Sequence, residues 1–271
     1  MDLQVLYEDN HIIAVNKKVG ELVQGDRSGD PCLIDALKRY LKETYHKPGN
    51  VFLGVVHRLD RPTSGVVLFA RTSKALQRLN TQFRENRVHK LYWAMVKVAP
   101  PKPSDTLIHY LRRNTTQNKS YAEDNPVEGH KEARMSYRWV LSLDRYHLLE
   151  VELHTGRHHQ IRAQLAKIGC PVKGDLKYGF PRSNPDGGIH LHARAVCLDH
   201  PVRKIPLQIT ADPPADPIWD AVLQRLAESN ISVAEQLPDL RQPDASGMSV
   251  PRTIVGSPTV RRFGLAPGEK G

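Results

Sequence analysis

Two neighbouring segments in the middle of the chain, 134–143 and 148–154, alternate apolar and polar residues with a period of two. This alternation is typical of antiparallel strands that bury one face. Apolar residues at helical spacing mark four other segments, which start near residues 30, 73, 155 and 217. Because helices and strands follow no regular strand–helix–strand alternation, the pattern predicts an α+β fold with a mixed, mainly antiparallel sheet and flanking helices.

The remaining elements are predicted from shorter patterns. Asp30 followed by Pro31 is the expected start of the first helix, and Thr155-Gly156 the expected start of the third. The stretch from 100 to 129 is polar and is expected to be mostly loop. Further strands are expected over 3–7, 12–16, 54–59, 66–70 and 91–98.

The chain is basic, with a formal net charge of +10 and a pI near 9.6. Such a balance favours a polyanionic partner, because neutralising phosphates releases counterions. No apolar run is long enough to cross a membrane, and the N-terminus does not resemble a signal peptide. The three cysteines form no CxxC pair, so we expect neither disulfides nor a thiolate metal site, and a cytoplasmic location.

Asp60 stands at the end of an apolar run, between Arg58 and Arg61, in the segment Gly54–Gly65. Flanking cations favour an ionised carboxylate, as a nucleophile requires, and could also contact an RNA backbone. The alternative is a turn aspartate in a surface ion pair.

Two further segments carry reactive side chains. Tyr92 follows Lys90 in an aromatic strand, where its ring could stack on a base and its hydroxyl could exchange a proton, or it could be a core tyrosine. In His154–Arg162, free amides near Gly156, together with Arg157, predict an anion site, and Arg162 could pair with a buried carboxylate. The adjacent His158 and His159 do not face the same way on a helix, so metal binding is not expected.

Together these segments closely resemble the RluA-type pseudouridine synthases. That family is marked by His-Arg-Leu-Asp followed by Thr-Ser-Gly, a lysine-aromatic-tyrosine strand, Thr-Gly-Arg-x-His-Gln-Ile-Arg, Gly-Asp-x-x-Tyr and Leu-His-Ala. The matching residues appear in the same order, at 57–60, 63–65, 90–92, 155–162, 174–178 and 191–193. At the N-terminus, Lys18 replaces the proline that is usual in the family's Val-Asn-Lys-Pro-x-Gly turn.

The resemblance implies the pseudouridine synthase fold with a central RNA-binding catalytic cleft. It also implies isomerisation of uridine in ribosomal or transfer RNA, with Asp60 as nucleophile on a flipped-out uridine, Tyr92 against the base or in proton transfer, and Arg162 paired with Asp60. It implies no cofactor and no metal. We assign RNA contact to Arg58, Arg61, Arg157, His159 and Gln160.

We expect residues 1–228 to form the catalytic domain, without the N-terminal S4 module of some relatives, and the protein to act as a monomer. Residues 229–271 are rich in Pro, Ser, Gly and Arg, and are expected to be a disordered basic tail.

Two other functions remain open at this stage. A non-catalytic RNA-binding protein would explain the charge and the aromatic residues. A nucleoside or RNA N-glycosidase would also use a carboxylate, but it typically needs a second one. The sequence suggests no second acid near Asp60, and Asp175 is interpreted as structural. The target uridine and the choice among attack at C1′, addition at C6 and a glycal route are likewise open.

Overall fold

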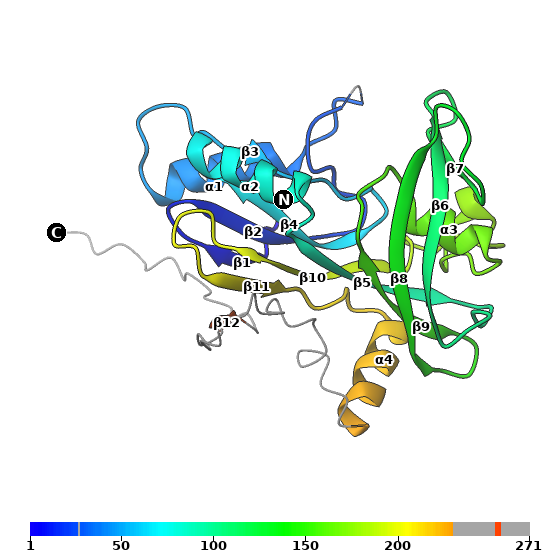
Figure 1. The fold of residues 1–271 in the computed structure, drawn as a ribbon. Coiled ribbons are helices and arrows are strands. Elements are labelled where there is room, and N and C mark those ends of the chain that lie inside the picture. The colour runs from blue at the N-terminus through cyan, green and yellow to red at the C-terminus, as the bar shows by residue number, and fades with distance from the viewer. Residues whose placement is uncertain (27, 230–252, 256–271) are drawn as a thin grey trace, which may run out of the picture.

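The computed structural model describes residues 1–26, 28–229 and 253–255 (Figure 1). It has the predicted α+β fold: a mixed sheet in the order β1-β2-β4-β10-β5-β9-β8-β6-β7, with β3, β11 and β12 attached beside it. The strands are β1 Val5–Glu8, β2 Ile12–Lys17, β3 Gly54–Val55, β4 Ser64–Ala70, β5 His89–Val96, β6 Ser104–Asn114, β7 Lys119–Glu123, β8 Lys131–Ser142, β9 His147–Leu153, β10 Leu191–Asp199, β11 Pro206–Thr210 and β12 Thr253–Val255. The helices are α1 Leu33–Thr44, α2 Ser73–Arg84, α3 Gln160–Lys167, the 3-10 helix η1 Leu176–Tyr178, and α4 Pro217–Glu228.

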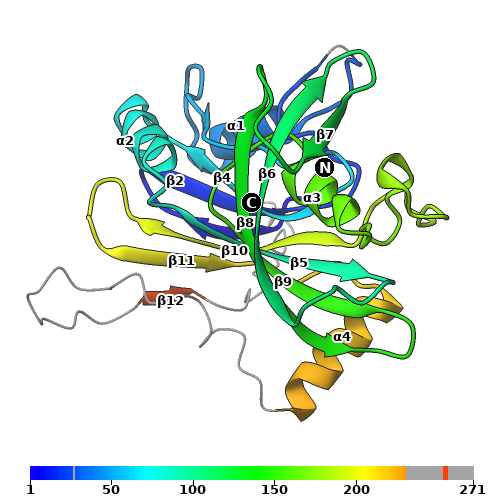
Figure 2. The ribbon, with the colours of Figure 1, turned by 45° about the vertical axis from the view of Figure 1, so that its right-hand side comes forward.

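The sheet is mainly antiparallel, as predicted. Only β4–β10 and β11–β12 pair in parallel among the described strands. The central order β4-β10-β5 is important for function, because it places the loop before β4 next to the middle of β5, although the two are far apart in sequence. In Figures 1 and 2, α3 lies beside β6 and β7 in both views.

Both faces of the N-terminal part of the sheet are buried. Ile13 and Val15 of β2 share a core cluster with Leu37 of α1, whereas Ile12 shares one with Leu79 of α2. Alternate residues of one strand point to opposite faces, so β2 reads as a continuous apolar run. A further cluster joins α4 to β5, with Trp219 stacked against Trp93 at 6.3 Å between ring centroids.

Two expected helix starts were wrong. Cys32, not Asp30, is the N-cap of α1, and the Asp30 carboxylate instead forms an ion pair with Arg61 at 2.8 Å. The third helix begins at Gln160 rather than at Thr155, because the preceding residue, His159, takes the left-handed conformation with φ +53°. At neither of these two helix starts does the side chain of the N-cap residue accept a backbone amide.

The expectation of loop over 100–129 was also wrong, since this stretch contains β6 and β7. On β6, Leu107, His109 and Leu111 point into the protein, and the residues between them are exposed or half-buried. The exposed positions include the apolar Ile108 and the buried positions include the polar His109, so polarity does not follow burial along β6 and the sequence shows no clear alternation.

Most of the tail predicted for 229–271 lies outside the described residues. The part that is described there includes Thr253–Val255, which pairs in parallel with β11. The boundary at residue 228 and the disorder of the tail therefore stay predictions. No helix in the described part of the chain is long and apolar enough to cross a membrane.

Candidate active site

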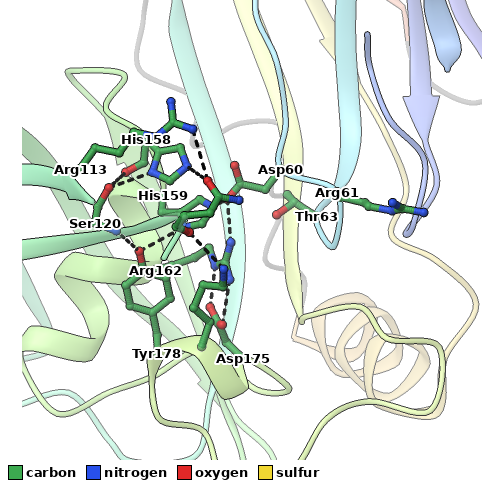
Figure 3. A network of polar contacts seen from close by, with 12 residues as sticks. Asp60, Arg61, Thr63, Arg113, Ser120, His158, His159, Arg162, Asp175 and Tyr178 are labelled. Carbon is green, nitrogen blue, oxygen red and sulfur yellow. Dashed lines mark hydrogen bonds and ion pairs between the residues drawn. The ribbon is translucent and has the colours of Figure 1, made fainter. Parts of the chain in front are cut away.

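Asp60 lies on the loop that joins β3 to β4 (Figure 3). The Thr63 amide donates to the Asp60 carbonyl at 3.0 Å, which closes a tight turn directly after the carboxylate. β4 then passes so close to β10 that a Cβ on Gly65, whose φ is +116°, would collide with the Ala193 backbone. Only glycine fits at this position, and the close approach holds the turn against β10.

A buried lysine holds the same turn from beneath. The Lys17 ammonium donates to the carbonyls of Lys18, Arg61 and Thr63 at 2.9, 3.1 and 2.7 Å. The side chain is fully buried, and burial lowers the pKa of Lys17 to about 8. The turn that carries Asp60 is therefore held by Lys17 on one side and by the close packing of Gly65 against β10 on the other.

Arg162, from α3, bridges two carboxylates. Its Nη1 donates to Asp60 Oδ2 at 3.0 Å, and its Nε and Nη2 donate to the two oxygens of Asp175 at 2.6 and 2.9 Å. Burial disfavours the guanidinium, but Asp175 and Asp60 outweigh it, so the pKa of Arg162 stays above its ordinary value. The predicted Asp60–Arg162 pair is present in the structure, with Asp175 as an anchor on the far side of the guanidinium.

His159 stands on the other side of Asp60. Its Nε2 lies 3.5 Å from Asp60 Oδ2, and its Nδ1 lies 3.0 Å from the Tyr178 hydroxyl. The Tyr178 hydroxyl also accepts the amide N–H of Ser120 at 2.8 Å. Strand β7, helix η1 and the start of α3 thus converge on the Asp60 carboxylate, as Figure 3 shows.

Tyr92 occupies the middle of β5, opposite Ala193 of β10, the residue that contacts Gly65. Its side chain packs in the same core cluster as Leu59, the neighbour of Asp60. Burial, reinforced by the Asp60 charge, raises the pKa of Tyr92 well above its ordinary value, so the phenol keeps its proton. Its hydroxyl forms no hydrogen bond with any residue that the structure describes.

The residues assigned to RNA contact divide into three kinds. Arg58 is exposed and has no ion pair within the described part of the chain. Arg61 points away from Asp60 (Figure 3) and is bound to Asp30 and the Gly20 carbonyl, while Arg157 donates to the Glu132 carbonyl. The other two, His159 and Gln160, are buried, and His159 lies beside Asp60.

The geometry gives Gln160 a structural task in place of RNA contact. Its Oε1 accepts the Thr155 hydroxyl and the Arg157 amide at 2.8 and 2.9 Å, and its Nε2 donates to the Arg134 carbonyl at 3.0 Å. The Thr155 amide also donates to the Arg134 carbonyl. Since two of the amides expected to bind an anion are already used, the anion site predicted near Gly156 is not formed as expected.

Sequence reasoning missed Asp175, Tyr178, Ser120 and Lys17 as parts of this site. It interpreted Asp175 as structural, which agrees with the hydrogen bonds that Asp175 makes to Arg162. It was wrong to expect no second acid near Asp60, because Arg162 bridges the two carboxylates. The signal was available for two of them, since Asp175 and Tyr178 stand three residues apart in the Gly-Asp-x-x-Tyr segment. Nothing local marks Ser120, which acts through its backbone N–H and its position on β7.

Among the described residues, no group of three or more His, Cys, Asp or Glu side chains is placed to hold a metal ion. The absence of metal and cofactor from the working enzyme stays a prediction.

Comparison with known proteins identifies the family. The family model for RNA pseudouridylate synthase matches residues 11–167, a stretch that includes Asp60, Tyr92 and Arg162. Over 228 residues the chain is 34% identical to a ribosomal large subunit pseudouridine synthase D from Xylella fastidiosa, covering 79% of this chain and 67% of that one. It is 33% identical to a tRNA pseudouridine synthase C from Salmonella typhi, covering 82% and 88%.

An uncharacterized RNA pseudouridine synthase from Synechocystis is 32% identical over 74% of this chain, and the match spans 62% of that relative's length. Among solved structures, human RNA pseudouridylate synthase domain containing 4 superposes with a TM-score of 0.67 at 24% identity, covering 83% of this chain and 93% of the human one. That likeness shows the fold. The family model and the relatives together show that the chain belongs to the RNA pseudouridylate synthase family, in its RluA-type branch.

Proposed function

We propose that the protein isomerises uridine to pseudouridine in RNA, with Asp60 as the nucleophile. The observation that carries this is an accessible carboxylate held by a buried cation. The Asp60 side chain is 27% exposed, whereas the Arg162 side chain that binds it is only 5% exposed. A substrate can reach the carboxylate from solvent, and the guanidinium holds it in a fixed orientation.

The reaction needs no partner beyond the RNA. The N1–C1′ bond of uridine breaks, the uracil turns, a C5–C1′ bond forms, and the proton on C5 is exchanged for one on N1. Nothing is oxidised or reduced and no group is donated, so the chemistry requires no cofactor. Asp60 would attack C1′ or C6, or would remove the C2′ proton on a glycal route, and all three routes require its carboxylate.

Tyr92 is the second group that we place against the base. Its phenol keeps its proton and has no partner among the described residues, so its hydroxyl is free to hydrogen-bond the uracil or to pass a proton. Its ring can also stack on the extruded base, as aromatic side chains do for unpaired bases.

The exposed Arg58 is suited to fill the space that a flipped uridine leaves in its stack, because a guanidinium is planar and cationic. Arg61 and Arg157 are exposed. Each guanidinium has more N–H donors than the protein uses, so the remaining donors can bind phosphate. Two relatives are named for ribosomal and transfer RNA. We therefore infer that the substrate is a ribosomal or a transfer RNA.

The same reasoning extends to cellular context. Cys32, Cys170 and Cys197 are buried thiols, as suits a reducing compartment. We propose that the protein acts in the cytoplasm, as a monomer.

The two alternative functions make different demands. An N-glycosidase would need a second carboxylate with a free oxygen, but both oxygens of Asp175 accept bonds from Arg162 and its side chain is 1% exposed. A passive RNA-binding protein gives no reason for a buried Arg162 beneath Asp60.

Transcriptome-wide pseudouridine mapping in cells with and without the gene would identify the target sites. In vitro, RNA carrying 5-[³H]uridine should release tritium to water while its uracil stays attached to the chain. Release of free uracil would support the glycosidase. RNA binding without release of tritium or uracil would support the non-catalytic RNA-binding protein.

A further inference from the structure

Two donors reach one oxygen of Asp60 and leave the other free. Arg162 Nη1 lies 3.0 Å and His159 Nε2 lies 3.5 Å from Oδ2. Oδ1 has no hydrogen bond or ion pair with any residue in the described part of the chain. The two oxygens of the nucleophile are therefore not equivalent.

His159 is a neutral imidazole at this position. Burial, assisted by the positive charges of Arg162 and of Lys177 and Arg113 nearby, lowers its pKa to about 2. A neutral imidazole carries one proton, on either Nδ1 or Nε2, and the hydrogen bonds around the ring decide which nitrogen holds it.

The neighbours of His159 select the Nε2 proton. The Ser120 amide can only donate, and it donates to the Tyr178 oxygen at 2.8 Å. The Tyr178 hydroxyl keeps its own proton, because burial raises its pKa to about 12, and it can donate that proton to His159 Nδ1 at 3.0 Å. With Nδ1 accepting, the ring proton is on Nε2 and points at Asp60 Oδ2.

The ring has little freedom to leave this orientation. It stacks on the His158 ring, with centroids 3.7 Å apart and planes 20° from parallel. The Ser120 hydroxyl binds both the carbonyl oxygen of His158 and its Nδ1. His159 itself adopts φ +53°, a left-handed conformation that is uncommon outside glycine, although histidine, like asparagine and aspartate, is enriched there.

We propose that His159 is a positioning residue: its Nε2–H, together with Arg162, holds Oδ2 of Asp60 so that Oδ1 is the oxygen that reacts. The Ser120–Tyr178 pair sets the tautomer that makes this possible. The inference rests on the proposed function, since it assigns a reacting atom to the same nucleophile. At 3.5 Å the contact is longer than a formed hydrogen bond, and we expect it to shorten when substrate closes the site.

The test uses two substitutions of His159 that differ in reach. His159→Asn suits the left-handed backbone, but its shorter amide corresponds to Nδ1 and cannot reach Asp60. His159→Gln extends an amide N–H to the former Nε2 position. With tritium release from 5-[³H]uridine RNA, we expect kcat to fall about 10-fold in His159→Asn, the loss expected for one hydrogen bond to a charged group, with KM nearly unchanged. His159→Gln should recover most of that loss.

A second measurement does not depend on any variant folding. In the ¹⁵N spectrum of the unmodified full-length protein, His159 should show a protonated Nε2 and an unprotonated Nδ1, and the signal should be assigned by through-bond correlation to the backbone of His159. A protonated Nδ1 or a doubly protonated ring would overturn the proposal. So would a His159→Asn enzyme with wild-type kcat, or a His159→Gln enzyme no better than His159→Asn.

Failure of the proposed function would look different. In that case the wild-type protein would release no more tritium than Asp60→Asn, whatever the state of His159. Tyr178→Phe supplies a further check, because it keeps the aromatic ring but removes the donor to Nδ1. We expect it to lower kcat less than His159→Asn does and to leave KM in place.

Discussion

Removing the Arg162 charge should destabilise the protein and abolish its activity, and the two effects should be separable. In Arg162→Met the side chain keeps its length but loses three hydrogen bonds to carboxylates. The Asp175 side chain is 1% exposed and would be left without its cationic partner, whereas Asp60, 27% exposed, would regain water. An uncompensated buried charge of this kind costs about 3–5 kcal/mol of unfolding free energy.

That loss is large beside the roughly 5–15 kcal/mol that holds a typical domain together. The double variant Arg162→Met/Asp175→Leu removes both buried charges and should recover most of the stability, because apolar replacement of a buried pair is often close to neutral. Its activity should not recover, since Asp60 still lacks its cation. Arg157→Met is the matched control, because the side chain of this exposed arginine makes one hydrogen bond among the described residues, to the Glu132 carbonyl; we expect a change within about 1 kcal/mol.

Urea unfolding followed by tryptophan fluorescence gives the free energies, and tritium release gives the activities. The reasoning is refuted if Arg162→Met unfolds at the same urea concentration as Arg157→Met. It is also refuted if the double variant is as unstable as the single one, since the cost then does not come from the uncompensated Asp175 charge.

Other predictions follow from the site and the chain. Asp60→Asn should abolish turnover while RNA binding by filter assay stays within a few-fold of wild type; substantial residual turnover would mean that another residue is the nucleophile. Burial lowers the pKa of His192 from 6.5 to about 4, so its stabilising effect is complete above pH 6.5 and is lost as the pH falls towards 4, at a cost of about 3 kcal/mol. If the urea midpoint of His192→Gln falls between pH 6.5 and 4 as much as that of the wild type, the loss of stability does not come from His192. Activity on a short stem-loop RNA should survive excess chelator, and a loss that zinc or magnesium restores would show that a metal takes part. Deleting residues 229–271 should leave fold and turnover intact, because the core clusters lie within residues 1–228, and should at most weaken RNA binding with a shallower salt dependence; an insoluble product would show that the deleted residues contribute to folding.

Local sequence patterns were sufficient to predict a helix or strand where apolar residues recur with the period of that element. The alternation over 134–143 and 148–154 correctly predicted β8 and β9. β9 differs from the expected half-buried strand, because Leu149 and Val151 pack in one core cluster and Leu148 in another. The helical spacing from residue 73 correctly predicted α2, whose N-cap Thr72 accepts the Ala75 amide. The same rule missed β6, where Ile108 is exposed and His109 is buried, so polarity does not follow burial.

For the active site, the sequence determined the residue types and the family, through short motifs that keep their order along the chain. The tertiary structure alone decided their partners. Asp60 and Arg162 are 102 residues apart and meet because β4, β10, β5 and β9 lie side by side in the sheet, with Asp60 on the loop before β4 and Arg162 on α3, the helix that follows β9. That Asp175 anchors Arg162, and that Ser120 orders the Tyr178–His159 contact, depends on hydrogen bonds between segments distant in sequence. Periodicity reports only whether a side chain is buried, so the partner that satisfies a buried charge is visible only once the chain has folded.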